Sequence, residues 1–295
     1  MLVLGLVAAS APVRFRAAPL GPLWPPFRLL SLLPVFHPFH RVTASPWPLA
    51  ISVALYNLAV AAVGSFTGLA GAGTALLCAL LAVAFVLALW LRDVVAEGTY
   101  LGDHTSDVVR GIGLGVVLFI TTEVRVFVAI FWAYFHAALS PAVEVGVSWP
   151  SAGIAAIDPF ALPLLNTVLL LSSGAAVTYA HHGIVAGSRG SALVGMALTL
   201  LLAVVFTVCQ GVEYQTAGFS MQDGVYGTVF YASTGAHGFH VALGTLFLLV
   251  GALRLFYGHL TTGHHRGLQF AIVYWHFVDL VWLVLFVVVY GFSAA

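Results

Sequence analysis

Glu123 is the residue of this chain that most suggests chemistry. It lies near the middle of the apolar run LFITTEVRVFVAIFWAYF. A carboxylate at the centre of a bilayer costs about 2.5–3.5 kcal/mol, so we expect this side chain to be protonated, paired or beside water. Arg125 is not the expected partner, because positions i and i+2 lie on different faces of a helix. Glu123 is therefore either a proton-linked or subunit-facing carboxyl, or a neutral acid that hydrogen-bonds a neighbouring helix.

His276 and Asp279 form a second polar pair inside an apolar run, AIVYWHFVDLVWLVLFVVVYGF. Their i, i+3 spacing places them on one face of a helix, where the imidazole can bond the carboxylate one turn away. We interpret them as a structural polar pair that allows both side chains to be buried.

The twelve histidines raise the question of a metal site. Di-iron membrane hydroxylases and desaturases gather histidines at one membrane face, because imidazole suits iron. Their HxxxH and HxxHH boxes have spacings that this chain lacks, and Cys78 and Cys209 lie in different apolar runs with no CxxC. We predict no metal ligands and keep the hydroxylase or desaturase as the alternative. The histidines gathered near one end of the apolar runs are His37, His40, His104, His181, His182, His259, His264 and His265.

The elements that must position these residues are membrane spans. The chain is 61% apolar and 7% charged, with a mean hydropathy of +1.06, which excludes an ordinary soluble domain. Each run is long enough to cross a hydrocarbon core of about 30 Å. We predict an all-α integral membrane protein with seven transmembrane helices, and the zero net charge gives no indication of a nucleic-acid partner. The runs are 49–69, 74–94, 106–138, 162–183, 190–213, 225–256 and 267–292.

The basic residues predict the orientation of these spans. The chain has no lysine, and nine of its ten arginines precede the first run or lie in the loops on that same side. The other four segments, 70–73, 139–161, 214–224 and the tail after 292, contain no basic residue. Under the positive-inside rule the N-terminus faces the cytoplasm or the mitochondrial matrix. An odd number of spans then places the C-terminus on the opposite side.

The first 36 residues differ from the rest. They contain Arg14, Arg16 and Arg28, several prolines and no acidic residue, a composition typical of organelle-targeting segments. We predict a retained, partly irregular arm over 1–36, followed by one domain over 37–295.

Polar side chains lie where spans reach the arginine-rich side. Glu97 and His104 flank the turn between the second and third runs, and Arg254 and His259 follow the sixth. Guanidinium and imidazole groups at this depth contact lipid head groups, or lie there as ordinary snorkelling side chains. Both interpretations stay open from the residues alone.

Eight sequence blocks in order resemble cytochrome c oxidase subunit III, from about His37 to Phe292. The blocks are HPFH followed by SPWPL (37–49), LWLRDVVAEGTYLGDHT (89–105), LFITTEV (118–124), FWAYFHAALSP (131–141), WPSAGI (149–154), LPLLNTVLLLSSGAAVTYAHH (162–182), EYQTAGF with DGVYGTVFYASTGAHGFHV (213–241) and YWHFVDLVWL (274–283).

The resemblance implies seven helices, the first two set apart from the other five by a lipid-filled cleft. Glu123 would be a buried carboxyl near partner subunit I, and no haem or copper would lie in this chain, because those metals belong to subunits I and II. Glu97, His104, Arg254 and His259 match positions that contact phospholipid in the family.

The implied function is that of an accessory core subunit of respiratory complex IV, which reduces oxygen with electrons from cytochrome c and pumps protons. The subunit supports proton uptake and stability. Enzymatic activity belongs to the complex, and any activity of the isolated chain stays open. The expected partners are subunits I and II, accessory subunits and membrane phospholipids. The expected location is the mitochondrial inner membrane, with the N-terminus in the matrix and the C-terminus in the intermembrane space, or alternatively a bacterial plasma membrane.

Overall fold

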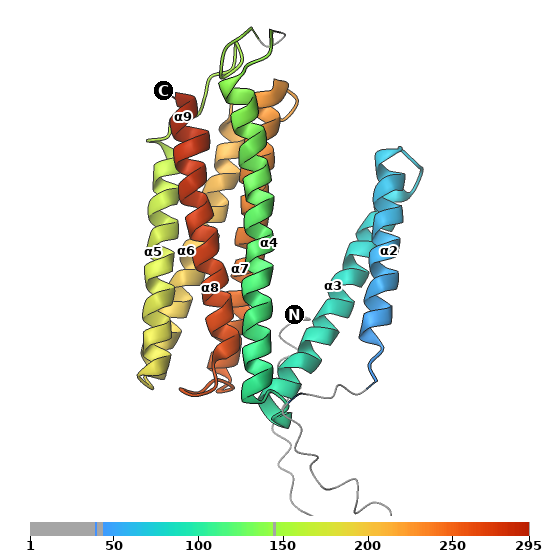
Figure 1. Ribbon diagram of the computed structural model, residues 1–295, viewed down its shortest axis with the longest axis vertical. Coiled ribbons are helices and arrows are strands. Elements are labelled where there is room, and N and C mark those ends of the chain that lie inside the picture. The colour runs from blue at the N-terminus through green and yellow to red at the C-terminus, as the bar shows by residue number, and fades with distance from the viewer. Residues whose placement is uncertain (1–38, 40–43, 144–145, 295) are drawn as a thin grey trace, which may run out of the picture. The chain divides into compact units, whose positions relative to one another are not determined.

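The computed structural model describes residues 39, 44–143 and 146–294, and all regular secondary structure in that part of the chain is helical (Figure 1). Seven of its helices are long and apolar enough to cross a membrane, which confirms the predicted architecture. The arm predicted for 1–36 lies outside the described residues, as do His37 and His40. The elements are α2 Trp47–Phe66, α3 Ala72–Ala96, η2 Glu97–Leu101, α4 Ser106–Leu139, α5 Leu162–Val185, α6 Arg189–Thr216, α7 Gly224–Phe256, α8 Arg266–Leu285, η4 Phe286–Gly291 and α9 Phe292–Ala294.

The second span is longer than the sequence indicates. It continues through the π-helical turn η2 to Leu101 instead of ending near residue 94. Gly102 then ends it with a left-handed φ of 73°, a conformation that favours glycine. Glu97 therefore lies within a helical turn, and not in a loop.

Contacts divide the chain into two compact units, residues 1–111 and 112–295. In the first unit, α2 packs against α3 through small side chains. Ala54 and Ala61 of α2 and Ala72 and Ala79 of α3 are all buried. Small residues let two membrane helices approach closely, because their backbones can come into contact. At the other end of this pair, the Trp47 indole donates a 2.6 Å hydrogen bond to Asp93.

In the second unit, α5 and α6 pack through glycines. A Cβ on Gly195 would lie 2.8 Å from the Ala176 carbonyl oxygen and from the Ala180 nitrogen. A Cβ on Gly183 would lie 2.8 Å from the Ala192 nitrogen. Both contacts are with backbone atoms, so only glycine permits this approach of the two helices.

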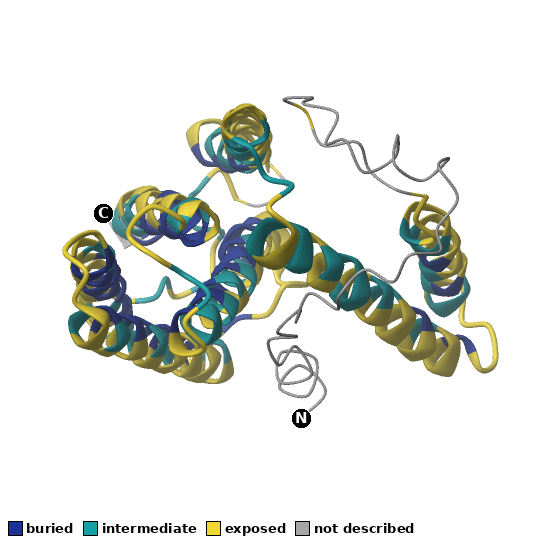
Figure 2. Cartoon of the chain, turned by 90° about the horizontal axis from the view of Figure 1, so that it is seen from below, coloured by how far each residue is buried: buried dark blue, intermediate teal, exposed yellow. Residues whose placement is uncertain are grey.

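Two buried tryptophans of α8 form hydrogen bonds with α5. Trp275 and Trp282 are fully buried. The Trp275 indole donates to the Ser173 hydroxyl at 2.9 Å, and the Trp282 indole donates to the Thr167 hydroxyl at 3.0 Å. Figure 2 shows exposed residues along the outer faces of the helices and buried residues on the faces turned toward their neighbours. Apolar outer faces are what a bilayer requires of a spanning helix.

Candidate functional site

Glu123 of α4 is paired with His240 of α7. The distance from His240 Nε2 to Glu123 Oε2 is 2.7 Å. The other ring nitrogen, Nδ1, lies 2.7 Å from the Ala236 carbonyl oxygen, which can only accept, so Nδ1 carries a proton. One further proton is then shared between Nε2 and the carboxyl. Whichever atom holds that proton, the pair has no net charge.

Aromatic rings surround the Glu123–His240 pair. The rings of Phe127 and Tyr274 lie 5.0 Å and 6.3 Å from the imidazole. The His240 side chain is 9% exposed, and the Glu123 side chain is 21% exposed. Within the described part of the chain, Glu123 makes no ion pair with Arg125, whose side chain is exposed on another face of α4. The pair is therefore a polar contact in a largely apolar interior.

His276 and Asp279 lie together on α8, with Nδ1 and Oδ2 separated by 3.5 Å. The imidazole Nε2 is also 3.2 Å from the Thr178 hydroxyl of α5. Asp279 is buried beside Gly174, where a Cβ would lie 2.6 Å from Oδ2. The His276 side chain is 45% exposed, so only one member of the pair is deeply buried. The group joins α8 to α5.

Arg254 and His259 lie next to each other where α7 ends. The His259 amide donates to the Arg254 carbonyl at 2.9 Å. The Arg254 guanidinium reaches Gly267 of α8, where a Cβ would lie 3.1 Å from Nη1. Burial, followed by the charge of Arg254, lowers the pKa of His259 below its ordinary value. The end of α7 therefore carries the cationic guanidinium of Arg254 next to a largely neutral His259 imidazole.

Glu97 and His104 lie together in the other unit. Glu97 begins the π-helical turn η2, and the His104 imidazole lies against the same turn. A Cβ on Gly98 would be 2.7 Å from His104 Nδ1. The structure thus brings the four residues predicted to contact lipid into two pairs, one in each unit.

Sequence reasoning did not identify Glu213 as a site residue. Glu213 is 1% exposed, and its Oε1 accepts a 2.6 Å hydrogen bond from the Tyr290 hydroxyl. The neighbouring Tyr214 hydroxyl bonds that of Thr234 at 2.7 Å. An acidic residue inside the last turn of an apolar span was the available signal. His240 was likewise not identified as a site residue, although a histidine deep in the run 225–256 was an available signal.

No metal centre is apparent in the described residues. Within them, no group of three or more His, Cys, Asp or Glu side chains is placed to hold a metal ion. Three of the histidines gathered near one end of the spans lie close together: the His181 ring is 5.4 Å from that of His265 and 6.3 Å from that of His182.

Comparisons with known proteins point to one family. The family model described as "Cytochrome c oxidase subunit III" matches residues 37–294. A cytochrome c oxidase subunit 3 from Mycosarcoma maydis is 56% identical over 264 residues, covering 88% of this chain and 96% of the relative. The subunit from Emericella nidulans is 54% identical over 254 residues, covering 86% and 94%. The subunit from Schizophyllum commune is 52% identical over 256 residues, covering 87% and 96%.

Proposed function

This chain belongs to the cytochrome c oxidase subunit III family, and we propose that within the oxidase it supports proton uptake and the long-term stability of the complex. The Glu123–His240 pair is the observation that carries this proposal. A pair that shares one proton can hold it, or move it from one side chain to the other, without placing net charge in the bilayer. We further propose that Glu123 lies near the interface with subunit I.

Replacement of Glu123 by Gln tests this role in the assembled oxidase. Gln preserves the shape and a hydrogen bond to His240, and it removes ionisation. We expect assembly to survive, with oxygen reduction and the proton-to-electron ratio at most modestly lowered. Arg125→Gln, an exposed neighbour on the same helix, is the control. Complete loss of oxygen reduction in Glu123→Gln would show an essential proton-transfer role and contradict an accessory subunit.

We propose that partner subunits I and II carry the haem and copper, and that this chain binds neither. Affinity purification of the chain in mild detergent should recover partners with a haem spectrum. After dissociation from them, the chain should retain iron and copper far below one atom per chain, measured by elemental analysis. The family match supports the oxidase and not the di-iron hydroxylase. Stoichiometric iron in the dissociated chain would reverse that conclusion.

We also propose that phospholipid head groups are bound at the arginine-rich end, by Arg254 and His259 in the second unit and by Glu97 and His104 in the first. The adjacent guanidinium and imidazole of Arg254 and His259 support it, because guanidinium binds phosphate in a bidentate manner. In the first unit, the Glu97 carboxylate would bind the ammonium group of a lipid. The lipid-filled cleft that the family resemblance implies stays a prediction.

Lipid mass spectrometry of the purified oxidase tests this site. We expect Arg254→Gln to lose one class of retained phospholipid. Arg266→Gln is the matched control, because Arg266 lies at the same end of the bundle and its guanidinium donates to the Gln269 side chain at 3.1 Å. Equal lipid retention in both variants would remove Arg254 from the site.

The fungal origin of the relatives supports a mitochondrial inner-membrane location, with a bacterial plasma membrane as the alternative. We propose subunits I and II and further accessory subunits as partners. The distribution of arginines supports an N-terminus in the matrix and a C-terminus in the intermembrane space.

A further inference from the structure

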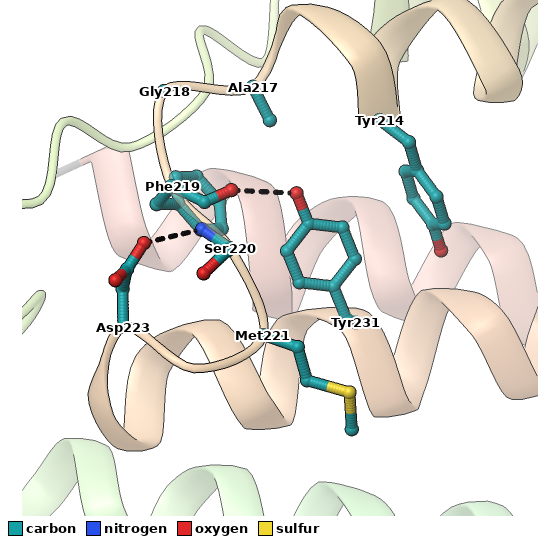
Figure 3. Close-up of a pocket in the computed structure, with 8 residues that line it drawn as sticks. All are labelled: Tyr214, Ala217, Gly218, Phe219, Ser220, Met221, Asp223 and Tyr231. Carbon is teal, nitrogen blue, oxygen red and sulfur yellow. Dashed lines mark hydrogen bonds between the residues drawn. The ribbon is translucent and has the colours of Figure 1, made fainter.

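The connection between α6 and α7 borders an open surface cavity of about 530 Å³ at the arginine-free end of the second unit (Figure 3). Three aromatic rings, one thioether and one carboxylate contribute to its wall, and the lining contains no basic residue. The lining residues are Tyr214, Ala217, Gly218, Phe219, Ser220, Met221, Asp223 and Tyr231.

The wall of this cavity is held in place by its own hydrogen bonds. The Tyr231 hydroxyl donates to the Phe219 carbonyl at 2.8 Å, and the Ser220 amide donates to the Asp223 carboxylate at 2.6 Å. The Tyr231 ring lies 5.0 Å from the Tyr214 ring and 5.7 Å from the Phe219 ring. Phe219 is only 6% exposed, so a ligand would meet the rings of Tyr214 and Tyr231 and the Asp223 carboxylate, which are already oriented, and this reduces the entropy lost on binding.

The charge around this cavity is negative and has no basic counterpart in the local sequence. In the described segments 146–161 and 214–224, the charged residues are Asp158 and Asp223, with no lysine or arginine. Glu213, one residue before the second segment, is 1% exposed, and its Oε2 has no hydrogen-bond partner among the described residues. The field at the cavity therefore favours a cation.

A second cavity, of about 260 Å³, adjoins the first and includes Glu213 in its lining. The two cavities share Ala217 and Gly218 as a common wall. Glu213 is withdrawn from water and bonded by the Tyr290 hydroxyl, so burial disfavours its charged form, and Asp223 supplies the negative charge of this wall.

We propose that the larger cavity binds an ammonium group. Aromatic faces combined with a carboxylate recognise alkylated ammonium groups through cation–π attraction and charge. The cavity lies where two spans end, at Thr216 and Gly224, which is the depth of lipid head groups. The shared chemistry fits a choline or ethanolamine head group and equally a free amine. This ammonium site is separate from the residues on which the proposed function rests.

Photolabelling of the assembled oxidase tests the ammonium site. The complex is placed in phosphatidylcholine nanodiscs with a trace of phosphatidylcholine carrying a diazirine on its choline group, and labelled peptides are mapped by mass spectrometry. A phosphatidylglycerol probe with the same diazirine is the head-group control. We expect the choline probe to label the 214–231 segment and the phosphatidylglycerol probe to label it weakly.

Three variants test separately the contributions of the Asp223 charge, the Tyr231 ring and the Tyr231 hydroxyl to labelling. Asp223→Asn keeps an acceptor for the Ser220 amide and removes the charge, so labelling should fall about two- to fivefold, the effect of one exposed charge pair. Tyr231→Leu removes the ring and should lower labelling similarly, whereas Tyr231→Phe keeps the ring and should leave labelling unchanged. Recovery of an intact haem spectrum after affinity purification through this chain confirms that each variant is assembled.

Competition identifies the source of the ammonium group. Free choline that suppresses labelling assigns the site to soluble amines, and suppression only by unlabelled phosphatidylcholine assigns it to the lipid. Equal labelling by the phosphatidylglycerol probe would overturn the proposal. Unchanged labelling in both Asp223→Asn and Tyr231→Leu would overturn it as well.

Discussion

At the scale of single residues, an ionisable side chain inside a membrane needs a partner on another helix. Glu123 lies at the middle of α4, Ser106–Leu139, and His240 lies at the middle of α7, Gly224–Phe256. Equal depth makes the two groups accessible to each other, and the 2.7 Å contact leaves the pair without net charge. Each residue thus lowers the cost of burying the other.

Truncation of Glu123 should be more harmful than neutralisation. Glu123→Ala leaves the His240 Nε2 in an aromatic surrounding without a partner, which costs about 1–3 kcal/mol. Glu123→Gln retains a hydrogen bond and should cost less than half as much. Thermal dissociation of the oxidase measures both. In a double-mutant cycle, adding His240→Ala to Glu123→Ala should cost little more, because the partners interact. Additive losses would show that the two side chains act independently.

His259 gives a pH dependence whose sign follows from its lowered pKa. Because the folded chain favours the neutral imidazole, its contribution to stability is complete above the ordinary pKa of 6.5 and is lost as the pH falls toward the lower folded value. A bound phosphate favours the imidazolium, so lipid binding at the proposed site should tighten on acidification, by up to about tenfold per pKa unit gained.

Retained phospholipid measured by mass spectrometry at pH 8 and pH 6 checks this prediction. His259→Gln should lose the difference between the two pH values, since Gln does not titrate in this range. An unchanged difference in that variant would assign the pH dependence to another group.

At the scale of elements, glycine sets the distance between α5 and α6. The two helices lie so close at Gly195 that an added methyl group would meet the backbone of α5. Gly211, further along α6, is exposed and has nothing within 4 Å of its would-be Cβ. One helix therefore carries a glycine that packing requires and one that packing does not require.

Alanine substitutions at Gly195 and Gly211 should change the stability of the assembled chain in opposite directions. Gly195→Ala forces the helices apart, and overpacking of this kind costs about 1–3 kcal/mol. Gly211→Ala should be neutral or stabilising by up to about 1 kcal/mol, because alanine favours a helix over glycine. Release of the chain from the oxidase on heating is the measurement. Equal melting of the two variants would mean that α5 and α6 adjust to the added methyl group.

At the scale of the whole molecule, charge and apolar surface have separate roles. Large apolar side chains on the outer faces, such as Leu201 at 60% exposure and Phe239 at 66%, are suited to lipid or partner helices. The arginines are confined to one end of the spans, apart from Arg125. The apolar outer faces predict that the helices span a membrane, and the distribution of arginines predicts the orientation of the chain in it.

Thiol labelling tests that direction. Ala152→Cys, in the arginine-free connection before α5, should react with a membrane-impermeant maleimide added from the intermembrane-space side. Gly263→Cys, in the connection between α7 and α8, should react only from the matrix side. Native Cys78 and Cys209 lie within spans, and the unmodified chain gives their background. The reverse pattern of labelling would contradict the positive-inside assignment.

The sequence by itself was sufficient for the helical class and the number of spans. Apolar length is a local property of the chain, so α4 and α7 were placed to within a residue or two before any packing was known. The order of sequence blocks indicated the family. The exception was the end of α3, where a π-helical turn extends the span to Leu101, because one added helical turn leaves no signal in composition.

The partners of buried polar groups were decided only by the tertiary structure. Glu123 was recognised as needing a partner, but His240 lies 117 residues away, and Tyr290 lies 77 residues from Glu213. Which side chains meet depends on which helices are neighbours and on how each is rotated about its axis. Neither is a local property: nearly uniform apolar helices can pack in many rotations, and close backbone contacts such as those of Gly183 and Gly195 select one of them.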